Sequence, residues 1–482
     1  MLAGSAGTGK TTIVREAVRR LRAQGRRPLL AAPTHKAAKR LRALTGEETG
    51  TLHSKLYRAP GEVQEDAGAA WVAMLNGAEE EAAEAVGEVE SRALAALRAR
   101  IPIGPDILAD AMAVLPQGVS RAARDIAAQA ATRFSRWQAR QDARIGANAL
   151  VFDNLREVLE GDVLVIDEAS MVNERMAADV FRVSPPVQVL AVGDHCQLPP
   201  VEGKAGYPLD EADAILTRIH RQAEGSAVLR FATEVREKRL SRRALLPAAE
   251  RQGILVKRAG FDTVAAVLAR SAKGERGFIG EGSEVCAVTQ NLTRIDINAR
   301  VRKMLGFPIF EAGPPAVGEK VIAVAAGGGL NNGEDGIVTK VEEGPCIGGV
   351  PTAKLTLDVG DADGIPVVGW LPLLAWANHD PTRARALKAG GTNLRELGRL
   401  SKGQTLEVRR HNPRTGVEIA AKEGLLFLAP AYAVTTWKLQ GSQYPRGLVL
   451  LESADWMEGD EWRVWYTAVT RFSESLMLVL PA

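Results

Sequence analysis

One glycine-rich stretch near the start of the chain restricts the possible folds more than any other feature. Residues 4–11 read GSAGTGKT, follow the three residues MLA, and run into a helical pattern that extends to residue 23. Glycines allow backbone N–H groups to surround a phosphate, while the Lys10 ammonium reaches the terminal phosphates and the Thr11 hydroxyl ligates Mg²⁺. The stretch therefore predicts a phosphate-binding loop (P-loop) between a strand and a helix of an α/β unit.

This loop supplies most of the residues that we expect to bind a nucleotide. They are Gly4, Ala6, Gly7, Thr8, Gly9, Lys10, Thr11 and Thr12. Lys10 is also expected to act in catalysis, and Thr11 to act as a metal ligand.

The buried strands of this unit are predicted by continuous apolar runs. Residues 28–32, 162–167 and 187–194 have such runs, and helical patterns alternate with them. This arrangement is typical of a parallel sheet that binds ligands at the carboxyl ends of its strands. Residues 61–150, rich in Ala, Glu and Arg, interrupt the pattern and predict a helical insertion.

A second α/β unit begins at the strand and helix predicted over residues 283–305. Residues 314–423 then contain short β-rich runs separated by glycines and by an Asn-Gly pair at 332–333. Asn-Gly is a strong hairpin signal, and the spacing of the runs suggests a small β-barrel. Buried-strand patterns resume at 424–436 and 446–453, so the barrel is expected to be inserted within the second unit.

Composition and cysteine content limit the class of protein. The chain has 482 residues, which suggests about three domains, and no apolar run long enough to span a membrane. Its three cysteines, Cys196, Cys286 and Cys346, form neither a disulfide framework nor a metal-binding pattern. We therefore expect a cytoplasmic protein without a secretory signal.

The net charge of +3 hides a basic block over residues 13–42, which carries ten Arg or Lys and one acidic residue. Such a block permits a polyanionic partner, and a solvated helix face is the alternative.

Two acidic residues and one amide follow the predicted strands. Asp167 and Glu168 end the run VLVIDE, where one carboxylate can hold the Mg²⁺ shell and the other can deprotonate the attacking water. Gln197, in GDHCQLPPV (193–201), is expected near the terminal phosphate, where its amide can sense hydrolysis. The alternative for residues 193–201 is a turn fixed by two prolines.

The order of motifs along the chain resembles that of superfamily 1 helicases, most closely the RecD-like and Dda-like 5′-to-3′ DNA helicases. The motifs are GSAGTGKT, APTHKAAKRL, TLHSKL, DEAS, GDHCQLPPV, LTRIHRQ, YAVTTWKLQGSQY and WYTAVTR. The resemblance covers both α/β units and nearly all of the chain outside residues 61–150.

The resemblance implies two RecA-like P-loop domains with nucleotide between them and single-stranded DNA across their tops. It further implies that the inserted barrel is SH3-like. The expected boundaries are 1–60 and 151–205 for the first domain, 61–150 for the helical insertion, 206–313 and 424–482 for the second domain, and 314–423 for the barrel.

By the same resemblance, two arginines of the second domain face the terminal phosphate, namely Arg221 in HRQ and Arg471 in VTR. Cations supplied from the far side of the cleft stabilise transition-state charge only when the cleft closes. The catalytic set is then Lys10, Glu168, Gln197, Arg221 and Arg471, and the nucleotide-binding set gains Asp167, Gln222 and Gly441. Asp167 joins Thr11 as a metal ligand.

The resemblance also implies which residues contact the DNA strand. They are Pro33, Thr34, His35, Thr51, His53, Thr436, Trp437 and Lys438. Helix capping is the alternative role for Thr34 and Thr51. Trp437 stands where the family usually has His, so it can stack on a base, or it can be a core residue.

These observations predict an ATP-dependent and Mg²⁺-dependent DNA helicase or translocase that moves 5′ to 3′. Single-stranded DNA is the expected partner, with replication or recombination proteins as further candidates. We expect a monomer in the cytoplasm of a bacterial or phage-infected cell. A nucleic-acid-binding subunit with weak hydrolysis and an RNA helicase of the same superfamily are the alternatives.

Two departures from the family pattern add expectations. The strand-separating pin of Dda-like enzymes would follow the TLHS motif, where the insertion at 61–150 stands. Only three residues precede the P-loop, whereas the family has an adenine-reading glutamine upstream of it. We therefore expect the chain either to use all four nucleoside triphosphates within about an order of magnitude or to be a truncated product. We also expect its short first strand to lower its stability.

Overall fold

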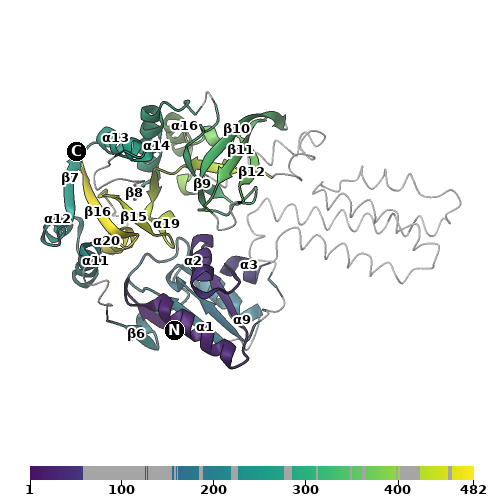
Figure 1. Ribbon diagram of the computed structural model, residues 1–482, viewed down its shortest axis with the longest axis vertical. Helices are drawn as coiled ribbons and strands as arrows, with labels where there is room; N and C mark the ends of the chain where they lie inside the picture. Colours follow the sequence, from purple (N-terminus) through teal and green to yellow (C-terminus); the bar gives the residue numbers. More distant parts are fainter. Residues whose placement is uncertain are drawn as a thin grey trace.

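The computed structural model describes two parallel-sheet units and a third, antiparallel sheet that lies beside α14 (Asn291–Leu305) and α16 (Pro381–Ala389) of the C-terminal unit (Figure 1). The described residues are 1–57, 125, 128, 155–156, 159, 161–183, 188–218, 226–275, 285–310, 313–347, 350–360, 365–397, 400–401, 424–453, 457 and 459–482. The helical insertion predicted over residues 61–150 lies outside this set except for residues 125 and 128. In the described part of the chain, no helix is both long and apolar enough to cross a membrane.

The N-terminal unit is built on a six-stranded parallel sheet with the order β3-β2-β4-β5-β1-β6. Its strands are β1 (Leu2–Gly4), β2 (Pro28–Ala32), β3 (Thr49–Thr51), β4 (Val163–Ile166), β5 (Gln188–Gly193) and β6 (Ala214–Leu216). Its helices are α1 (Lys10–Ala23), α2 (His35–Thr45), α3 (Leu52–Leu56) and α9 (Glu174–Val183), with short 3-10 turns η1 (Ala169–Met171) and η2 (Leu209–Glu211).

Strand β4 shows why this sheet is covered on both faces. Val163 and Val165 pack with residues of α1 and α2, whereas Leu164 and Ile166 pack with residues of α3 and α9. Side chains alternate between the faces of a strand, so an unbroken apolar run requires helices on both sides.

Strand β1, which leads into the P-loop, has only three residues but is paired on both sides. Leu2 lies opposite Val192 of β5 and Ala214 of β6. Residues 214–216 therefore belong to the N-terminal sheet, although the predicted end of the first domain is residue 205.

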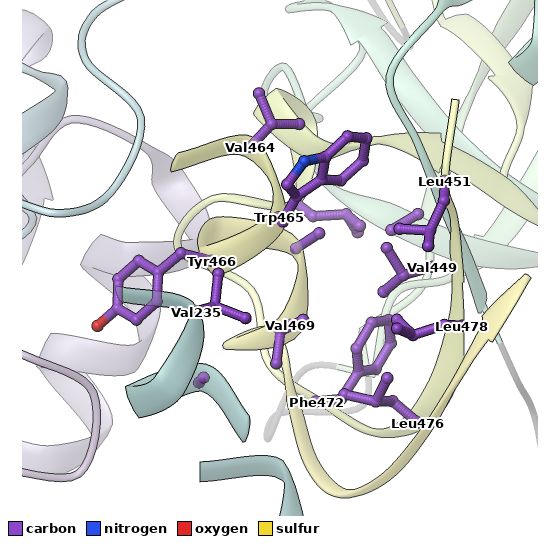
Figure 2. Close-up of a cluster of buried hydrophobic side chains, with 14 of the residues drawn as sticks. Val235, Val449, Leu451, Val464, Trp465, Tyr466, Val469, Phe472, Leu476 and Leu478 are labelled. Carbon is purple, nitrogen blue, oxygen red and sulfur yellow. The ribbon is translucent and has the colours of Figure 1, made fainter. Parts of the chain in front are cut away.

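The C-terminal unit has a five-stranded parallel sheet with the order β14-β8-β15-β16-β7. Its strands are β7 (Leu255–Ala259), β8 (Val285–Val288), β14 (Ala433–Thr435), β15 (Tyr444–Leu450) and β16 (Phe472–Pro481). Its helices are α11 (Ala227–Lys238), α12 (Arg242–Arg251), α13 (Phe261–Ala272), α14 (Asn291–Leu305), α19 (Thr436–Leu439) and α20 (Glu461–Val469). Figure 2 shows the apolar cluster on one face, where Trp465 and Val469 of α20 lie against Val449 and Leu478 of the sheet.

The third sheet is antiparallel, with the order β12-β11-β10-β9-β13. Its strands are β9 (Lys320–Ala325), β10 (Asp335–Ile347), β11 (Val350–Asp358), β12 (Val367–Pro372) and β13 (Phe427–Pro430), and β12 leads to α15 (Leu373–Ala377), α16 (Pro381–Ala389) and η3 (Leu394–Glu396). Its two edges meet, because the Trp370 N–H donates to the Gly424 carbonyl (3.0 Å) and the Leu426 N–H donates to the Trp370 carbonyl (2.8 Å). Strand β13 pairs with β9 and so belongs to this sheet, although it lies beyond the predicted boundary at residue 423.

A buried ion pair attaches the antiparallel sheet to the C-terminal unit. Arg302 on α14 pairs with Glu319, which immediately precedes β9, and their side chains are 2% and 0% exposed. The Arg302 guanidinium also lies 4.4 Å from the ring centroid of Phe310 and 4.8 Å from that of Trp376. The aromatic rings and the carboxylate together make this buried charge tolerable.

Candidate nucleotide and DNA-strand sites

The P-loop has the backbone conformation that its glycines predict. Gly7 (φ 80°) and Gly9 (φ 84°) occupy the left-handed region, and Gly9 immediately precedes α1. A Cβ atom at Gly4 would lie 2.6 Å from the Thr8 hydroxyl oxygen, which donates to the Ser5 carbonyl (2.8 Å). The loop therefore needs glycine both for its turn and for its internal packing.

Lys10 lies folded over this loop. Its ammonium donates to the carbonyl oxygens of Gly4 (2.6 Å) and Ser5 (3.0 Å). Both acceptors are neutral, and the charge of Lys10 partly offsets the rise that burial causes in the pKa of Asp167. The ammonium is thus available to an incoming phosphate, which is a stronger acceptor than a carbonyl.

Asp167 and Glu168 form a half-buried acidic pair at the end of β4. Burial, and next the charge of Glu168, raises the pKa of Asp167. Glu168 has a left-handed backbone (φ 54°), and its Oε2 is buried without a hydrogen-bond partner among the described residues. A non-glycine residue costs of order 1–3 kcal/mol in such a conformation, which is characteristic of functional sites.

This pair fits a divalent cation. Hard carboxylate oxygens are the ligands that Mg²⁺ prefers, and a cation beside Asp167 would relieve the like-charge repulsion between the two acids. Among the predicted ligands, Asp167 supplies a half-buried carboxylate, and Thr11 lies at the start of α1, the helix that follows the P-loop.

Gln197 lies in the segment that follows β5. Its backbone N–H donates to the Asp194 carbonyl (3.1 Å), while its side-chain Oε1 is buried and has no partner within the described residues. Unpaired buried amide oxygens are uncommon, so Gln197 resembles a side chain that awaits a ligand or water.

Arg471 approaches this group from the C-terminal unit, just after α20. The residue is 4% exposed, and its guanidinium donates to the carbonyls of Thr467 (3.1 Å) and Ser442 (3.4 Å) and to the Thr470 hydroxyl (3.0 Å). Burial lowers its pKa, whereas the charge of Glu168 across the contact raises it. Arg221 and Gln222 lie outside the described residues. We call the contact formed by the P-loop, Asp167, Glu168, Gln197 and Arg471 the nucleotide edge.

The predicted strand-binding residues lie at a second contact, formed by α2, α19 and the turn 331–335 before β10. Thr34 caps α2 by accepting from the Ala37 N–H (3.2 Å), and Thr51 caps α3 by accepting from the Ser54 N–H (3.1 Å). Their capping role is therefore observed, and a binding role would come in addition to it. Pro33 is half-buried directly before this cap.

His35 and His53 lie close enough to influence each other. Burial lowers the pKa of both imidazoles, and the charge of His35 further lowers that of His53. The His53 ring also lies 4.7 Å from the ring of Tyr57. Both histidines therefore favour the neutral form, which can donate one hydrogen bond to a phosphate.

The residues predicted on α19 differ in their accessibility. Thr436 is buried, and its hydroxyl donates to the Val288 carbonyl (3.3 Å). Trp437 is half-buried against the apolar cluster of the C-terminal unit, and the Arg395 guanidinium lies 5.8 Å from its ring centroid. Lys438 donates to the Asn332 side-chain oxygen (3.2 Å). Burial lowers the pKa of Lys438 to about 7, and the charges of Arg294 and Lys36 contribute.

A cavity of about 630 Å³ lies between α2, the turn 331–335 and the loop 441–444. Lys36 spans it, with ammonium contacts to the Asp335 carboxylate (2.6 Å) and the Tyr444 hydroxyl (3.3 Å). We call this contact, with His35, Lys36, Lys438, Asn332 and Asp335, the strand edge.

Gly441 was predicted to bind nucleotide, and it lies where the two units touch. Its φ is 76°, and an added Cβ would lie 2.7 Å from the Thr34 hydroxyl oxygen. Glycine thus allows this loop to approach α2. The next residue, Ser442, supplies a carbonyl to Arg471, which connects the strand edge to the nucleotide edge.

Sequence reasoning missed several residues that join the two units. The Tyr466 hydroxyl on α20 accepts from the Ala6 N–H of the P-loop (3.1 Å) and donates to the Asp194 carboxylate (2.6 Å). The Leu198 N–H donates to the Thr467 hydroxyl (3.0 Å). One sequence feature could have pointed to these residues: a Tyr and a Thr stand side by side in the otherwise apolar end of α20, WYTAV.

Comparison with known proteins agrees with the motif order. Residues 1–203 match the family model described as an AAA domain (AAA_19). The chain is 32% identical over 133 residues to the ATP-dependent RecD2 DNA helicase of Deinococcus radiodurans, a match that covers 24% of this chain and 18% of that protein.

Among solved structures, the chain is similar to the Pif1 helicase from Bacteroides in complex with ADP-AlF3 and ssDNA (17% identity, TM-score 0.43, 99% of this chain and 87% of that chain). It is also similar to the Pif1 helicase from Candida albicans (17% identity, TM-score 0.42, 99% and 89%). The match to the RecD2 helicase and the match to the AAA-domain model bear out the resemblance to RecD-like superfamily 1 helicases that the eight ordered motifs predict.

Proposed function

We propose that the chain is an ATP-dependent DNA helicase or translocase that moves 5′ to 3′ on single-stranded DNA. The observation that carries the proposal is the nucleotide edge, where a P-loop and an acidic pair of one unit meet a buried arginine of the other. Such a site binds a nucleoside triphosphate between two bodies, so that its hydrolysis can change their relative position.

Each residue of the nucleotide edge has a role in this proposal. The P-loop amides and Lys10 bind the phosphates, and Glu168 accepts the proton of the attacking water. Gln197 orients that water, while Arg471, with Arg221, stabilises charge on the transferred phosphoryl group. Mg²⁺ bound by Thr11 and Asp167 would neutralise phosphate charge, which makes ATP and Mg²⁺ the expected cofactors. Gln222 is proposed to complete the nucleotide pocket.

The strand edge is the proposed path of the DNA. Lys36 and Lys438 supply charge for backbone phosphates, and the histidines His35 and His53 supply neutral donors. Trp437 can offer a ring face to a base. Sequence-independent contacts of this kind suit a protein that moves along a strand.

We further propose that the two units are RecA-like domains and that the antiparallel sheet is an SH3-like barrel inserted in the second. With the corrected strands, the first domain extends through residue 216, and the barrel extends through residue 430. A helical insertion over residues 61–150 remains part of the proposal. The direction of movement rests on the resemblance of the motifs.

The test is hydrolysis and unwinding by the whole chain. ATP hydrolysis should be weak alone and rise at least tenfold with single-stranded DNA, and duplexes with a 5′ tail should be separated in preference to those with a 3′ tail. Competition with RNA of the same sequence separates a DNA helicase from an RNA helicase. Nucleic-acid binding without stimulated hydrolysis would instead indicate a binding subunit.

A further inference from the structure

The hydroxyl of Tyr466 is the feature of the contact between the units that the proposed function leaves unexplained. It accepts from the Ala6 N–H in the P-loop (3.1 Å) and donates to Asp194 Oδ2 (2.6 Å). Both partners belong to the N-terminal unit, whereas Tyr466 belongs to α20 of the C-terminal unit. One oxygen atom therefore joins the P-loop, the segment after β5 and α20.

Packing alone does not require this hydroxyl. In Figure 2, Trp465, Val469 and Phe472 point into the apolar cluster, while the Tyr466 ring points away from it and its oxygen faces the N-terminal unit. Tyr466 is 1% exposed and Asp194 is 0% exposed. A hydroxyl buried this deeply costs stability unless it is hydrogen-bonded, so its two bonds are a specific arrangement.

The Asp194 carboxylate fixes the direction of the Tyr466 hydroxyl. Its Oδ1 accepts from the Cys196 N–H (3.0 Å), so the carboxylate is held on both oxygens. Burial, and next the charge of Asp194, raises the pKa of Tyr466 well above its usual value, so the hydroxyl keeps its proton. The proton points to Asp194, and the oxygen lone pairs are left to face Ala6.

Tyr466 connects to Arg471 through a single helical turn. Thr467, the next residue, accepts from the Leu198 N–H through its hydroxyl and from the Arg471 Nε–H (3.1 Å) through its carbonyl. Leu198 is adjacent to Gln197. The tip of α20 is therefore fixed to the P-loop on one side and to the Gln197 segment on the other, and Arg471 projects from this fixed tip.

We propose that Tyr466 is a positioning residue for hydrolysis. Its hydroxyl sets the position of Arg471 and Gln197 relative to the P-loop when the two units are in contact. It touches neither the reacting phosphate nor the attacking water in this proposal, and acts through Arg471. The inference rests on the proposed nucleotide hydrolysis and adds the residue that aligns its two halves.

The chain contains a matched control for this proposal. Tyr57 also donates its hydroxyl to a buried carboxylate, Asp179 (2.7 Å), but both residues lie in the N-terminal unit and outside the nucleotide edge. Tyr57→Phe removes the same kind of bond as Tyr466→Phe. The two variants therefore separate loss of stability from loss of alignment.

The experiment compares wild type, Tyr466→Phe, Tyr57→Phe, Arg471→Ala and the Tyr466→Phe/Arg471→Ala double variant in steady-state hydrolysis with saturating single-stranded DNA. Tyr466→Phe should lower kcat about tenfold and change KM for ATP less than about twofold. The reason is that a misaligned Arg471 stabilises the transition state less, while binding of ATP in the ground state is retained. Tyr57→Phe should retain wild-type kcat. In the Arg471→Ala background, Tyr466→Phe should cost almost nothing further, since residues that act as a unit are not additive.

A second readout does not depend on turnover. Tyr466→Phe should bind ADP as wild type does but lose about tenfold of its affinity for ADP with aluminium fluoride, a transition-state mimic. Equal kcat in Tyr466→Phe and Tyr57→Phe, or full additivity with Arg471→Ala, would overturn the inference. A wild-type protein that binds no nucleotide would instead overturn the proposed function itself.

Discussion

The nucleotide edge and the strand edge join the same two halves of the molecule with different chemistry. At the nucleotide edge, buried neutral groups such as Tyr466, Thr467 and backbone amides make hydrogen bonds of defined direction. At the strand edge, the Lys36–Asp335 ion pair lines a cavity, and the weakly basic Lys438 donates to Asn332. Directional bonds align catalytic groups, whereas mobile charges can exchange one anionic partner for another. This difference supports the proposal of chemistry at one edge and polyanion binding at the other.

The largest expected effect is a loss of hydrolysis with DNA binding retained. Lys10→Ala and Glu168→Gln should each lower DNA-stimulated hydrolysis at least about 10³-fold, because they remove phosphate binding and the general base. Glu168→Gln should still bind nucleotide, and both variants should bind single-stranded DNA within about twofold of wild type. Hydrolysis and fluorescence anisotropy with a labelled oligonucleotide measure the two properties. Near-normal turnover in Glu168→Gln would show that another group is the base.

A smaller effect is expected at the strand edge when Trp437 is replaced. If its ring stacks on a base, Trp437→Ala should weaken single-stranded DNA binding by about 1–3 kcal/mol while DNA-free hydrolysis is retained. Trp437→Phe keeps an aromatic face, so its affinity for single-stranded DNA should lie between those of wild type and Trp437→Ala. Because the ring also packs on the apolar cluster, melting temperatures must accompany the binding data. Unchanged affinity per folded molecule with a lower melting temperature would make Trp437 a core residue.

The pKa of Lys438 predicts how the strand edge responds to pH. With a pKa of about 7, Lys438 is charged at pH 6 and largely neutral at pH 8, so DNA affinity should fall severalfold across this interval. The neighbouring Arg294 and Lys36 stay charged between pH 6 and pH 8. The lowered pKa values of His35, His53 and His379 keep these imidazoles neutral through most of this interval. Lys438→Arg should flatten the dependence, since arginine does not titrate here. An equally steep profile in that variant would assign the titration elsewhere.

The smallest expected effect concerns the Lys36–Asp335 pair. Asp335→Asn frees Lys36 for a phosphate, so affinity for single-stranded DNA should rise about two- to threefold, and the dependence of log affinity on log salt should steepen by about 0.7. Asp358→Asn removes the same charge from the same sheet and leaves the pair intact, which makes it the control. Equal effects of the two variants would mean that net charge, and not this pair, governs binding.

Position along the strands was enough to predict that several residues of the nucleotide edge lie together. Lys10, Asp167 and Gln197 each follow a strand of one parallel sheet, and the ends of such strands meet at one edge whatever the rest of the fold does. Tyr466 and Asp194 were missed because a hydroxyl in an apolar helix carries no sign of its partner, which lies 272 residues away.

Two predicted boundaries differ from the observed strand pairing for a similar reason. Strand β6 has three residues, too few for a periodic pattern to appear. Strand β13 reads FLAP and is buried throughout, so it looks like a continuation of the parallel sheet although it pairs antiparallel with β9. Local patterns report how deeply a strand is buried, but they do not report which neighbour it pairs with.

The buried Arg302–Glu319 pair has a mechanical consequence. Breaking such a pair by pulling its partners apart would expose an uncompensated charge to an apolar interior, at a cost of about 3–5 kcal/mol. The antiparallel sheet is therefore expected to move with the C-terminal unit as one rigid body. Because the turn 331–335 of that sheet contacts α2 through the Lys36–Asp335 pair, a small rotation at the nucleotide edge would displace the strand edge.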